Sequence, residues 1–347
     1  MINTIFLGLF ATAQAGDINV TAKGHANNPV WSADGKKIAF EINAQAGDIS
    51  LFVANIENGE NSGSPKEISL NVGGSSFGGS GGVITAAPVW HETGILFFEG
   101  SHKGGSNRIY MNDFRGSPSK QAVSEKLVSG DLSWPAMSKD GGLLVFVSDA
   151  TGMGDIYTFN IRNWKEVKGI TASEHSEMAP QFNKEGNIIY TRKRQEGEDV
   201  FLFDGSASSD WVGGAGDQTR PNWAGSSVVF FSSERGGDVW DVVVSSSPGN
   251  KKTLAKGVRL PFRAPPAVSP DGNWVVYGLE HPDKSNSMWA TKTDGSKTVE
   301  LKTKHEACGE PALTEVNGKI YLAYTGLPKE GSDWRQLHVI DVTSELQ

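Results

Sequence analysis

Residues 28–40 read Asn-Pro-Val-Trp-Ser-Ala-Asp-Gly-Lys-Lys-Ile-Ala-Phe, and this stretch carries the pattern that decides the fold. Pro29 is followed two residues later by Trp31, then by a polar turn and by the apolar run Ile38-Ala39-Phe40. The Asp34-Gly35 pair supplies the positive φ that a tight hairpin turn needs. Apolar segments on both sides of such a turn predict two antiparallel strands.

The same pattern recurs along the rest of the chain. Each copy has a proline, an aromatic or apolar residue two positions later, and an apolar strand after a short polar turn; the prolines are Pro29, Pro88, Pro135, Pro180, Pro221, Pro266 and Pro311. The first and last are 282 residues apart, so the mean of the six steps is 47 residues. A four-stranded propeller blade takes roughly 40–50 residues. We therefore predict an all-β fold, a seven-bladed β-propeller of four-stranded antiparallel blades.

The two ends of the repeat array predict how the ring closes. The last unit ends with Leu337-His338-Val339-Ile340, and little chain follows to form its outer strand. The segment Asp17-Ile18-Asn19-Val20-Thr21 precedes the first proline and reads as a strand. We expect this N-terminal strand to complete the last blade, which leaves no open sheet edge.

The first 15 residues are interpreted as a signal peptide. An apolar core at residues 5–10 runs into Ala13-Gln14-Ala15, a small-x-small cleavage pattern. This leaves residues 16–347 as a single propeller domain in the periplasm or outside the cell. No later stretch approaches the ~20 apolar residues that span a bilayer. The single cysteine, Cys308, cannot form an intramolecular disulfide.

The stretch from Asn28 to Phe40 resembles the P-x-W-S-P-D-G-x-x-I-A-F repeat of the TolB-like (PD40-type) propeller family. The resemblance extends over about residues 16–347 and implies the propeller fold. It does not imply one function, since such propellers serve as scaffolds, receptors and enzyme domains. TolB itself has six blades and an N-terminal α/β domain, neither of which this sequence indicates, so we expect a relative rather than a direct equivalent.

Charge and composition disfavour two classes of partner. The formal net charge of -8 repels phosphate backbones and anionic lipid heads. We therefore expect neither nucleic-acid binding nor membrane insertion.

The candidate site is the face on which the loops into the inner strands meet those between the second and third strands. Residues just ahead of the prolines border the central channel in a propeller. The candidates for ligand or partner binding are Asn28, Trp134, His175, Glu177, Arg220, Arg235 and Glu310. Arg220 and Glu310 either form a salt bridge on the rim or anchor a charged ligand or partner side chain.

No set of residues points to a catalytic mechanism. Gly78-Gly79-Ser80-Gly81-Gly82 matches the nucleophile pattern G-x-S-x-G, but it lies in a Gly-rich loop rather than at a strand-to-helix turn. His25, His175 and His305 are weak candidates for a divalent-metal site because their offsets from the nearest proline differ. No cofactor is otherwise expected.

The sequence favours a non-enzymatic, exported scaffold that binds an envelope or extracellular protein at the channel mouth. The alternative is a carbohydrate-binding or metal-dependent carbohydrate-active propeller with its site at the same place. A third hypothesis is a propeller left from a peptidase-like ancestor.

Overall fold

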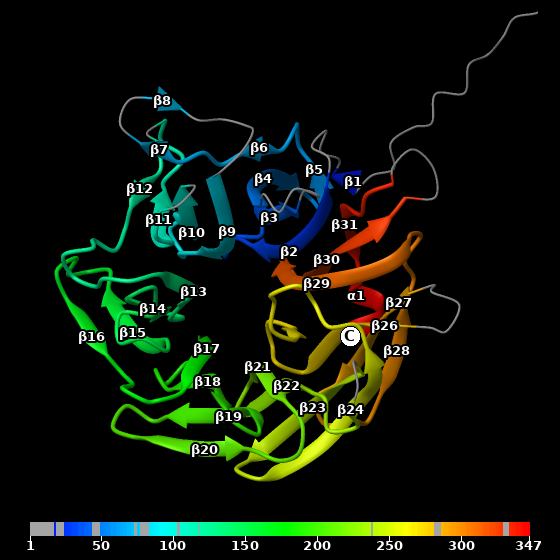
Figure 1. Cartoon of the computed structure of the whole chain (residues 1–347). Coiled ribbons are helices and arrows are strands. Elements are labelled where there is room, and N and C mark those ends of the chain that lie inside the picture. Colours follow the sequence, from blue (N-terminus) through cyan, green and yellow to red (C-terminus); the bar gives the residue numbers. More distant parts are fainter. Residues whose placement is uncertain are drawn as a thin grey trace, which may run out of the picture.

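The computed structural model describes residues 17–18, 24–43, 49–72, 75–76, 83–102, 105–116, 118–236, 239–280, 286–328 and 333–347 (Figure 1). The expected signal peptide at residues 1–15, residues 19–21 of the expected N-terminal strand and the G-x-S-x-G motif lie outside the described residues.

Four-stranded antiparallel sheets dominate the fold. Three of them follow the chain order. The first contains β9 (Val83–Trp90), β10 (Leu96–His102), β11 (Arg108–Asn112) and β12 (Lys120–Gln121). The second contains β13 (Leu132–Met137), β14 (Leu143–Ser148), β15 (Asp155–Asn160) and β16 (Val167–Gly169). The third contains β17 (Ser176–Phe182), β18 (Ile188–Arg194), β19 (Gly197–Phe203) and β20 (Ser208–Val212).

A fourth four-stranded sheet brings the two ends of the chain together. It contains β29 (Glu306–Val316), β30 (Lys319–Leu327) and β31 (Gln336–Asp341), with β1 (Asp17–Ile18) at its edge. Asp17 pairs with His338 and Ile18 with Leu337. A short helix, α1 (Thr343–Leu346), follows β31.

The remaining strands form two larger sheets and a small ribbon. The N-terminal sheet contains β2 (His25–Trp31), β3 (Lys37–Asn43), β4 (Ile49–Glu57), β5 (Glu60–Asn61) and β6 (Lys66–Glu67). An eight-stranded sheet contains β21 (Gln218–Ala224), β22 (Ser227–Ser232), β23 (Trp240–Ser247), β24 (Asn250–Val258), β25 (Ala267–Val268), β26 (Trp274–Glu280), β27 (Asn286–Lys292) and β28 (Thr298–Leu301). Its two halves are joined by one residue pair, Val258 with Leu279. The ribbon contains β7 (Asn71–Val72) and β8 (Ser75–Ser76).

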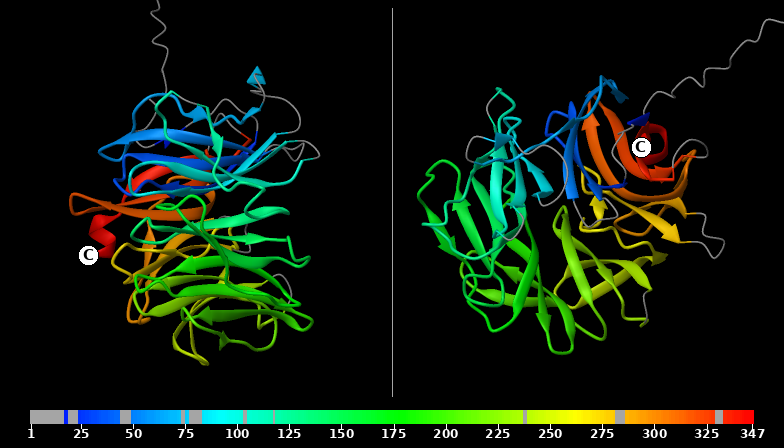
Figure 2. Two further views of the ribbon diagram at one scale, coloured as in Figure 1. Left: turned by 90° about the vertical axis from the view of Figure 1, so that its left-hand side faces the viewer. Right: turned by 45° about the horizontal axis from the view of Figure 1, so that its top comes forward.

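The sheets surround a central region in a propeller-type arrangement. In Figure 1 the strands β2, β9, β13, β17, β21 and β29 lie innermost, and later strands of each sheet lie toward the outside. The turned views in Figure 2 show the sheets following one another around this centre. The all-β prediction is therefore confirmed.

The apolar core lies between neighbouring sheets. One cluster joins Phe97 of β10 to Leu144 and Phe146 of β14, and another joins Trp31 and Ile38 to Tyr321 of β30. Alternate residues of each strand therefore face the adjacent sheet, as the period of two in a strand requires.

The tryptophan two residues after the proline fastens one sheet to the preceding one. The indole Nε1 of Trp31 donates a hydrogen bond to the carbonyl of Ala312 (3.1 Å), Trp90 donates to Val30 (3.0 Å), and Trp223 donates to Gln181 (3.1 Å). At these positions the aromatic residue therefore packs between neighbouring repeats.

The polar turn after the inner strand is built by its serine and aspartate. Ser32 Oγ donates to Asp34 Oδ1 (2.7 Å) and accepts from the backbone N–H of Lys37 (2.9 Å). Ser138 and Asp140 repeat the arrangement, as do Ser269 and Asp271. Gly35 takes a φ of 65° there, as its place in a hairpin turn predicts.

We predict that Gly35→Ala destabilises the fold more than Gly186→Ala does. Both glycines have positive φ, which costs alanine about 1–2 kcal/mol. A Cβ at Gly35 would lie 2.1 Å from Val316 Cγ2, whereas a Cβ at Gly186 meets nothing within 4 Å. The clash should add about 1–3 kcal/mol. Urea unfolding of the two variants tests this, and equal losses would contradict the close approach of Gly35 to β29.

Candidate functional site

A left-handed backbone recurs just before the inner-strand prolines. Positive φ values near 50° occur at Asn28, Ala87, Trp134, Ala179, Arg220 and Glu310. The strand pairing shifts register at or beside these positions, so the inner strands are bulged. Such a conformation is uncommon outside glycine. It also takes the backbone N–H out of the sheet ladder, so that this N–H needs another acceptor.

Side chains of adjacent strands provide those acceptors. Glu41 Oε1 of β3 accepts the N–H of Ala87 (2.7 Å), and Glu99 Oε1 of β10 accepts the N–H of Trp134 (2.7 Å). Thr191 Oγ1 of β18 accepts the N–H of Arg220 (2.9 Å). Three inner strands are thus linked to the sheet that precedes them by a buried side chain.

Glu310 makes the corresponding link between β29 and β2. Its Oε2 accepts the N–H of Asn28 (3.2 Å), and its Oε1 accepts the N–H of Phe262 (2.6 Å). Burial raises the pKa of Glu310, and the two N–H donors oppose that rise. Both carboxylate oxygens are therefore engaged with backbone rather than with a cation.

Residues 259–266, between β24 and β25, enter the centre of the propeller and are called here the channel segment (Figure 1, yellow). Arg263 donates to Glu99 with two bonds, Nη1 to Oε2 at 3.0 Å and Nη2 to Oε1 at 2.7 Å. Arg220 donates to the carbonyl of Pro261. Together with the bond from Phe262 to Glu310, these contacts fasten the channel segment to three different sheets.

Arg263 is the central cation of the site. Its burial alone would lower its pKa, but the charge and hydrogen bonds of Glu99 outweigh that effect and raise it. The guanidinium also lies 4.7 Å from the ring centre of Trp134. A cation over a tryptophan face is favourable by about 0.5–2 kcal/mol.

Of the three buried carboxylates Glu41, Glu99 and Glu310, Glu41 has the fewest neighbouring groups that stabilise a negative charge. It is fully buried, and although Oε1 also accepts Asn28 Nδ2 (2.8 Å), Oε2 has no hydrogen-bond partner. Burial raises its pKa to about 7, opposed by Asn28, the Ala87 N–H and Arg263. A protonated Oε2 has a smaller desolvation cost than an unpaired negative charge.

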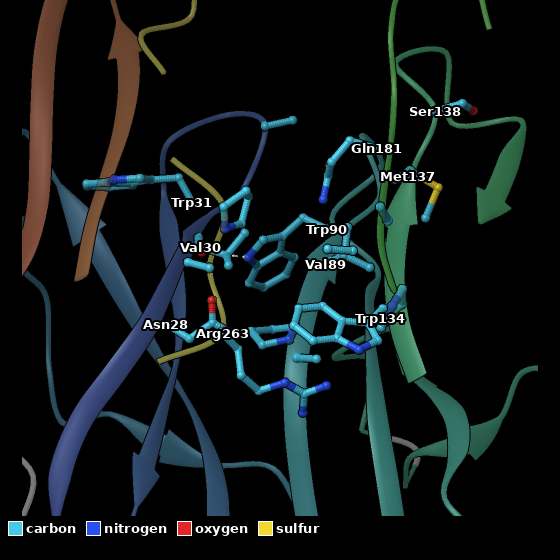
Figure 3. A pocket seen from close by; sticks show the side chains of 18 of the residues that line it. Asn28, Val30, Trp31, Val89, Trp90, Trp134, Met137, Ser138, Gln181 and Arg263 are labelled. Atoms are coloured by element: carbon cyan, nitrogen blue, oxygen red, sulfur yellow. Dashed lines mark hydrogen bonds between the residues drawn. The ribbon is translucent and has the colours of Figure 1, made fainter. Parts of the chain in front are cut away.

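A cavity of about 400 Å³ opens beside these groups (Figure 3). Its walls include Val30, Val89, Trp90, Trp134, Met137 and Gln181 from four successive inner strands, and Arg263 and Pro265 from the channel segment. In Figure 3 the guanidinium of Arg263 lies beside the indole of Trp134, while the Trp31 ring points away from them toward the neighbouring sheet. The lining is therefore mostly apolar and aromatic, with the half-buried cation of Arg263 beside it.

This cavity lies at the mouth formed by the turns after the inner strands. Ala33, Glu92, Ser138 and Lys139 of those turns line it. The sequence instead placed the site at the opposite mouth. Of the candidates named there, Asn28 and Trp134 line the cavity, and Arg220 and Glu310 lie in the channel.

Arg220 and Glu310, both within the described part of the chain, do not form the rim salt bridge that was one of the two expectations. Arg220 bonds the Pro261 carbonyl, and Glu310 accepts two backbone N–H groups. Each of the two residues bonds the channel segment instead of the other. The sequence does not reveal where that segment lies.

The other candidates lie away from the channel cavity. Glu177 is buried and bonds Arg192 Nε (3.0 Å) and Ser173 Oγ (2.8 Å). Arg235 pairs with Asp241 through two hydrogen bonds. His175 lines a separate polar depression of about 760 Å³ beside Arg194 and Asp199.

The three candidate metal ligands have different surroundings. His25 Nδ1 accepts the backbone N–H of Arg335 (3.1 Å), and His305 stacks on His338 with ring centres 3.4 Å apart. His175 lies in the depression described above. Among the residues that the structure describes, no group of three or more His, Cys, Asp or Glu side chains could hold a metal ion.

Glu41, Glu99 and Arg263 were not among the residues predicted from the sequence. Each glutamate follows an apolar run, Ile38-Ala39-Phe40 and Leu96-Phe97-Phe98, where an acid is unexpected in a buried strand. The proline-rich stretch Pro261-Phe262-Arg263-Ala264-Pro265-Pro266 breaks the repeat pattern. The unexpected acids and the proline-rich stretch indicate that these residues are unusual. They do not indicate that Arg263 contacts Glu99, which lies 164 positions earlier.

Comparison with protein families gives one match. The PD40 model, described as the TolB beta propeller domain, matches residues 87–317. No curated protein matches the chain significantly.

Several solved structures share the fold. TolB from Acinetobacter baumannii has a TM-score of 0.56 and 17% identity, covering 81% of this chain and 67% of that one. An oligogalacturonate lyase from Vibrio parahaemolyticus has a TM-score of 0.59 and 12% identity, with coverages of 96% and 92%. A puromycin-hydrolyzing peptidase from Mycobacterium tuberculosis has a TM-score of 0.63 and 14% identity; the match covers 96% of this chain and 55% of the peptidase. At these identities the likeness concerns the fold alone.

Glu41→Gln should remove a pH dependence of stability. A pKa raised from 4.5 to about 7 means that the folded state retains a proton that the unfolded chain releases. The stabilisation is complete below about pH 4.5 and is lost as the pH rises through about 7, by on the order of 3 kcal/mol. Glutamine retains the Oε1 acceptor and carries no charge.

Unfolding free energies of both proteins across this pH range test the prediction. The variant should gain stability relative to the wild type as the pH rises. A difference that does not change with pH would show that Glu41 does not titrate there.

Proposed function

Because this chain belongs to the family of TolB β-propeller domains, we propose that it is a protein-binding scaffold that docks a partner at the cavity beside Trp134 and Arg263. The partner would be another protein of the cell envelope or the extracellular space. The proposal includes no catalytic step.

The lining of the cavity is the observation that carries this proposal. Trp134 is partly exposed and rests against Arg263, whose position is held by two bonds to Glu99. Tryptophan and arginine are the residue types most often responsible for binding energy at protein interfaces. A rigid aromatic group in a concave, largely apolar site loses little conformational entropy on binding.

We further propose that the propeller has seven blades and is closed by the N-terminal strand. Two observations support this. The eight-stranded sheet consists of two groups of four strands joined only at Val258 and Leu279, and β1 pairs with β31. A closed ring would hold the inner strands in place around the cavity.

Export to the periplasm or beyond is also part of the proposal. It rests on the apolar core and cleavage pattern in residues 1–15. Within the described residues, no helix has the length and apolar character to cross a membrane.

A carbohydrate ligand is the second candidate. Exposed tryptophan faces can stack on sugar rings, and the solved fold that is an oligogalacturonate lyase aligns over 92% of its length. A sugar-binding propeller would use the same cavity. Binding of oligosaccharides by the wild type that is lost in a Trp134 variant would favour this alternative over a scaffold.

Trp134→Asn should abolish partner capture. Asparagine tolerates positive φ and already occupies the equivalent position at residue 28, so the bulge should persist. Truncating a central tryptophan costs about 2–4 kcal/mol of binding free energy, or roughly 30-fold or more in affinity. Crosslinking in the native envelope followed by mass spectrometry measures the loss.

Trp164→Asn is the matched control. Trp164 is 42% exposed and lies between β15 and β16, away from the cavity. The control should capture the same proteins as the wild type. Failure of the wild type to enrich any protein, or equal capture by the Trp134 variant, would overturn the scaffold proposal.

A further inference from the structure

Two arginines converge at the opposite mouth of the channel, outside the cavity described above. Arg259 follows β24 and Arg335 precedes β31, and both flank Gly309 of β29. Arg259 Nε lies 3.7 Å and Arg335 Nη1 lies 3.9 Å from the point where a Cβ on residue 309 would be. Both arginine side chains therefore lie over Gly309, which has no side chain of its own there.

His25 fixes the backbone of this cationic cluster, which we define as Arg259, Arg335 and His25. Its Nδ1 accepts the backbone N–H of Arg335 (3.1 Å), so the neutral ring carries its proton on Nε2. The ring packs edge-on against Trp334, with centres 5.1 Å apart. Arg335 is also held by a bond from Nη2 to Asn27 Oδ1 (3.3 Å).

Among the residues that the structure describes, no carboxylate in contact with the cluster matches its positive charge. Neither arginine has an acidic group within ion-pair distance in the described part of the chain. Against the larger effect of burial, both arginines lower the pKa of Glu310, but the two oxygens of Glu310 accept the N–H groups of Asn28 and Phe262. The positive groups of the cluster repel one another. Burial lowers the pKa of both Arg335 and His25 most, and the charge of Arg259 lowers both further.

One hydrogen-bond donor of the cluster is buried and unused. Arg335 Nη1, the atom that points toward the space at Gly309, is shielded from solvent and has no hydrogen-bond partner. Buried donors are almost always bonded, and an exception calls for a ligand, ion or water to complete it. Arg335 and Arg259 are otherwise partly exposed, so a ligand can approach from solvent.

We propose that Arg259 and Arg335 form a binding site for a carboxylate group. Guanidinium groups present planar, charged donors that match the two oxygens of a carboxylate. Glu310 already places one negative charge nearby, which favours a singly charged ligand group over a dianion such as inorganic phosphate. His25 and Asn27 keep Arg335 oriented toward the space beside Gly309.

This site does not depend on the proposed scaffold function. His25 begins β2, whereas Trp31 ends it beside the aromatic cavity, so the two sites lie at opposite ends of the channel. A ligand carboxylate here comes either from an acidic peptide or from an acidic sugar.

Titration of ¹⁵N-labelled protein with two probes tests the proposal. A tetraglutamate peptide and a trigalacturonate represent the two sources, and a tetraglutamine peptide is the uncharged control. We expect the Nε–H signals of Arg259 and Arg335 to shift with at least one acidic probe and not with the control. Binding of one probe alone identifies the source of the carboxylate.

Arg259→Met is the variant of choice, because the side chain of Arg259 makes no hydrogen bond in the described region and the fold should persist. It should weaken binding of the acidic probe at least 10-fold. Arg162→Met, which removes an exposed arginine paired with Asp140, should leave binding unchanged. Equal shifts with tetraglutamine, no shift with either acid, or unaltered binding by Arg259→Met would overturn the carboxylate site.

Discussion

The centre of this propeller depends on buried carboxylates that accept backbone N–H groups turned out of the sheet ladder. The bulge before the inner-strand proline leaves an N–H without a partner, and a buried N–H without an acceptor costs about 1–3 kcal/mol. Glu41, Glu99 and Glu310 each remove that cost at one inner strand. In exchange each of them buries a carboxyl group, whose negative charge is either stabilised by neighbouring groups or, at Glu41, reduced by protonation.

The three acids are stabilised by different partners, and these partners determine which chain segment lies at the centre of the propeller. Glu99 pairs with Arg263, Glu310 accepts a second N–H from the channel segment, and Glu41 retains an oxygen without a partner. Residues 259–266 are therefore drawn into the centre by two of the acids. Because Arg263 is held there, Trp134 has a cation against its ring and the cavity has a rigid wall.

The sequence predicts the parts of the fold that repeat and misses the parts that do not. Turns such as Ser32-Ala33-Asp34-Gly35 and the interlocking tryptophans follow from local pattern, because their partners occupy equivalent positions in neighbouring units. Asn28 and Trp134 line the cavity, and Arg220 and Glu310 contact the channel segment, because the residue before each of these prolines takes the same left-handed backbone conformation.

The contacts of the channel segment could not be predicted from the repeat pattern. Arg263, which bonds Glu99, lies in a stretch between β24 and β25 that has no counterpart in the other repeats. The salt bridge that was one of two alternatives for Arg220 and Glu310 does not form, because Arg220 donates instead to the Pro261 carbonyl of this segment. The histidines illustrate a related limit, since position near a proline does not determine which neighbour a long loop side chain will bond.

A double-mutant cycle between Glu99 and Arg263 tests the central claim most directly. The unfolding free energies of Glu99→Gln, Arg263→Met and the double variant are compared with that of the wild type. Since the pair is buried and doubly hydrogen-bonded, the coupling energy should be at least about 1.5 kcal/mol. Effects that add to within about 0.5 kcal/mol would show that Arg263 does not compensate Glu99, and the account of the channel would be wrong.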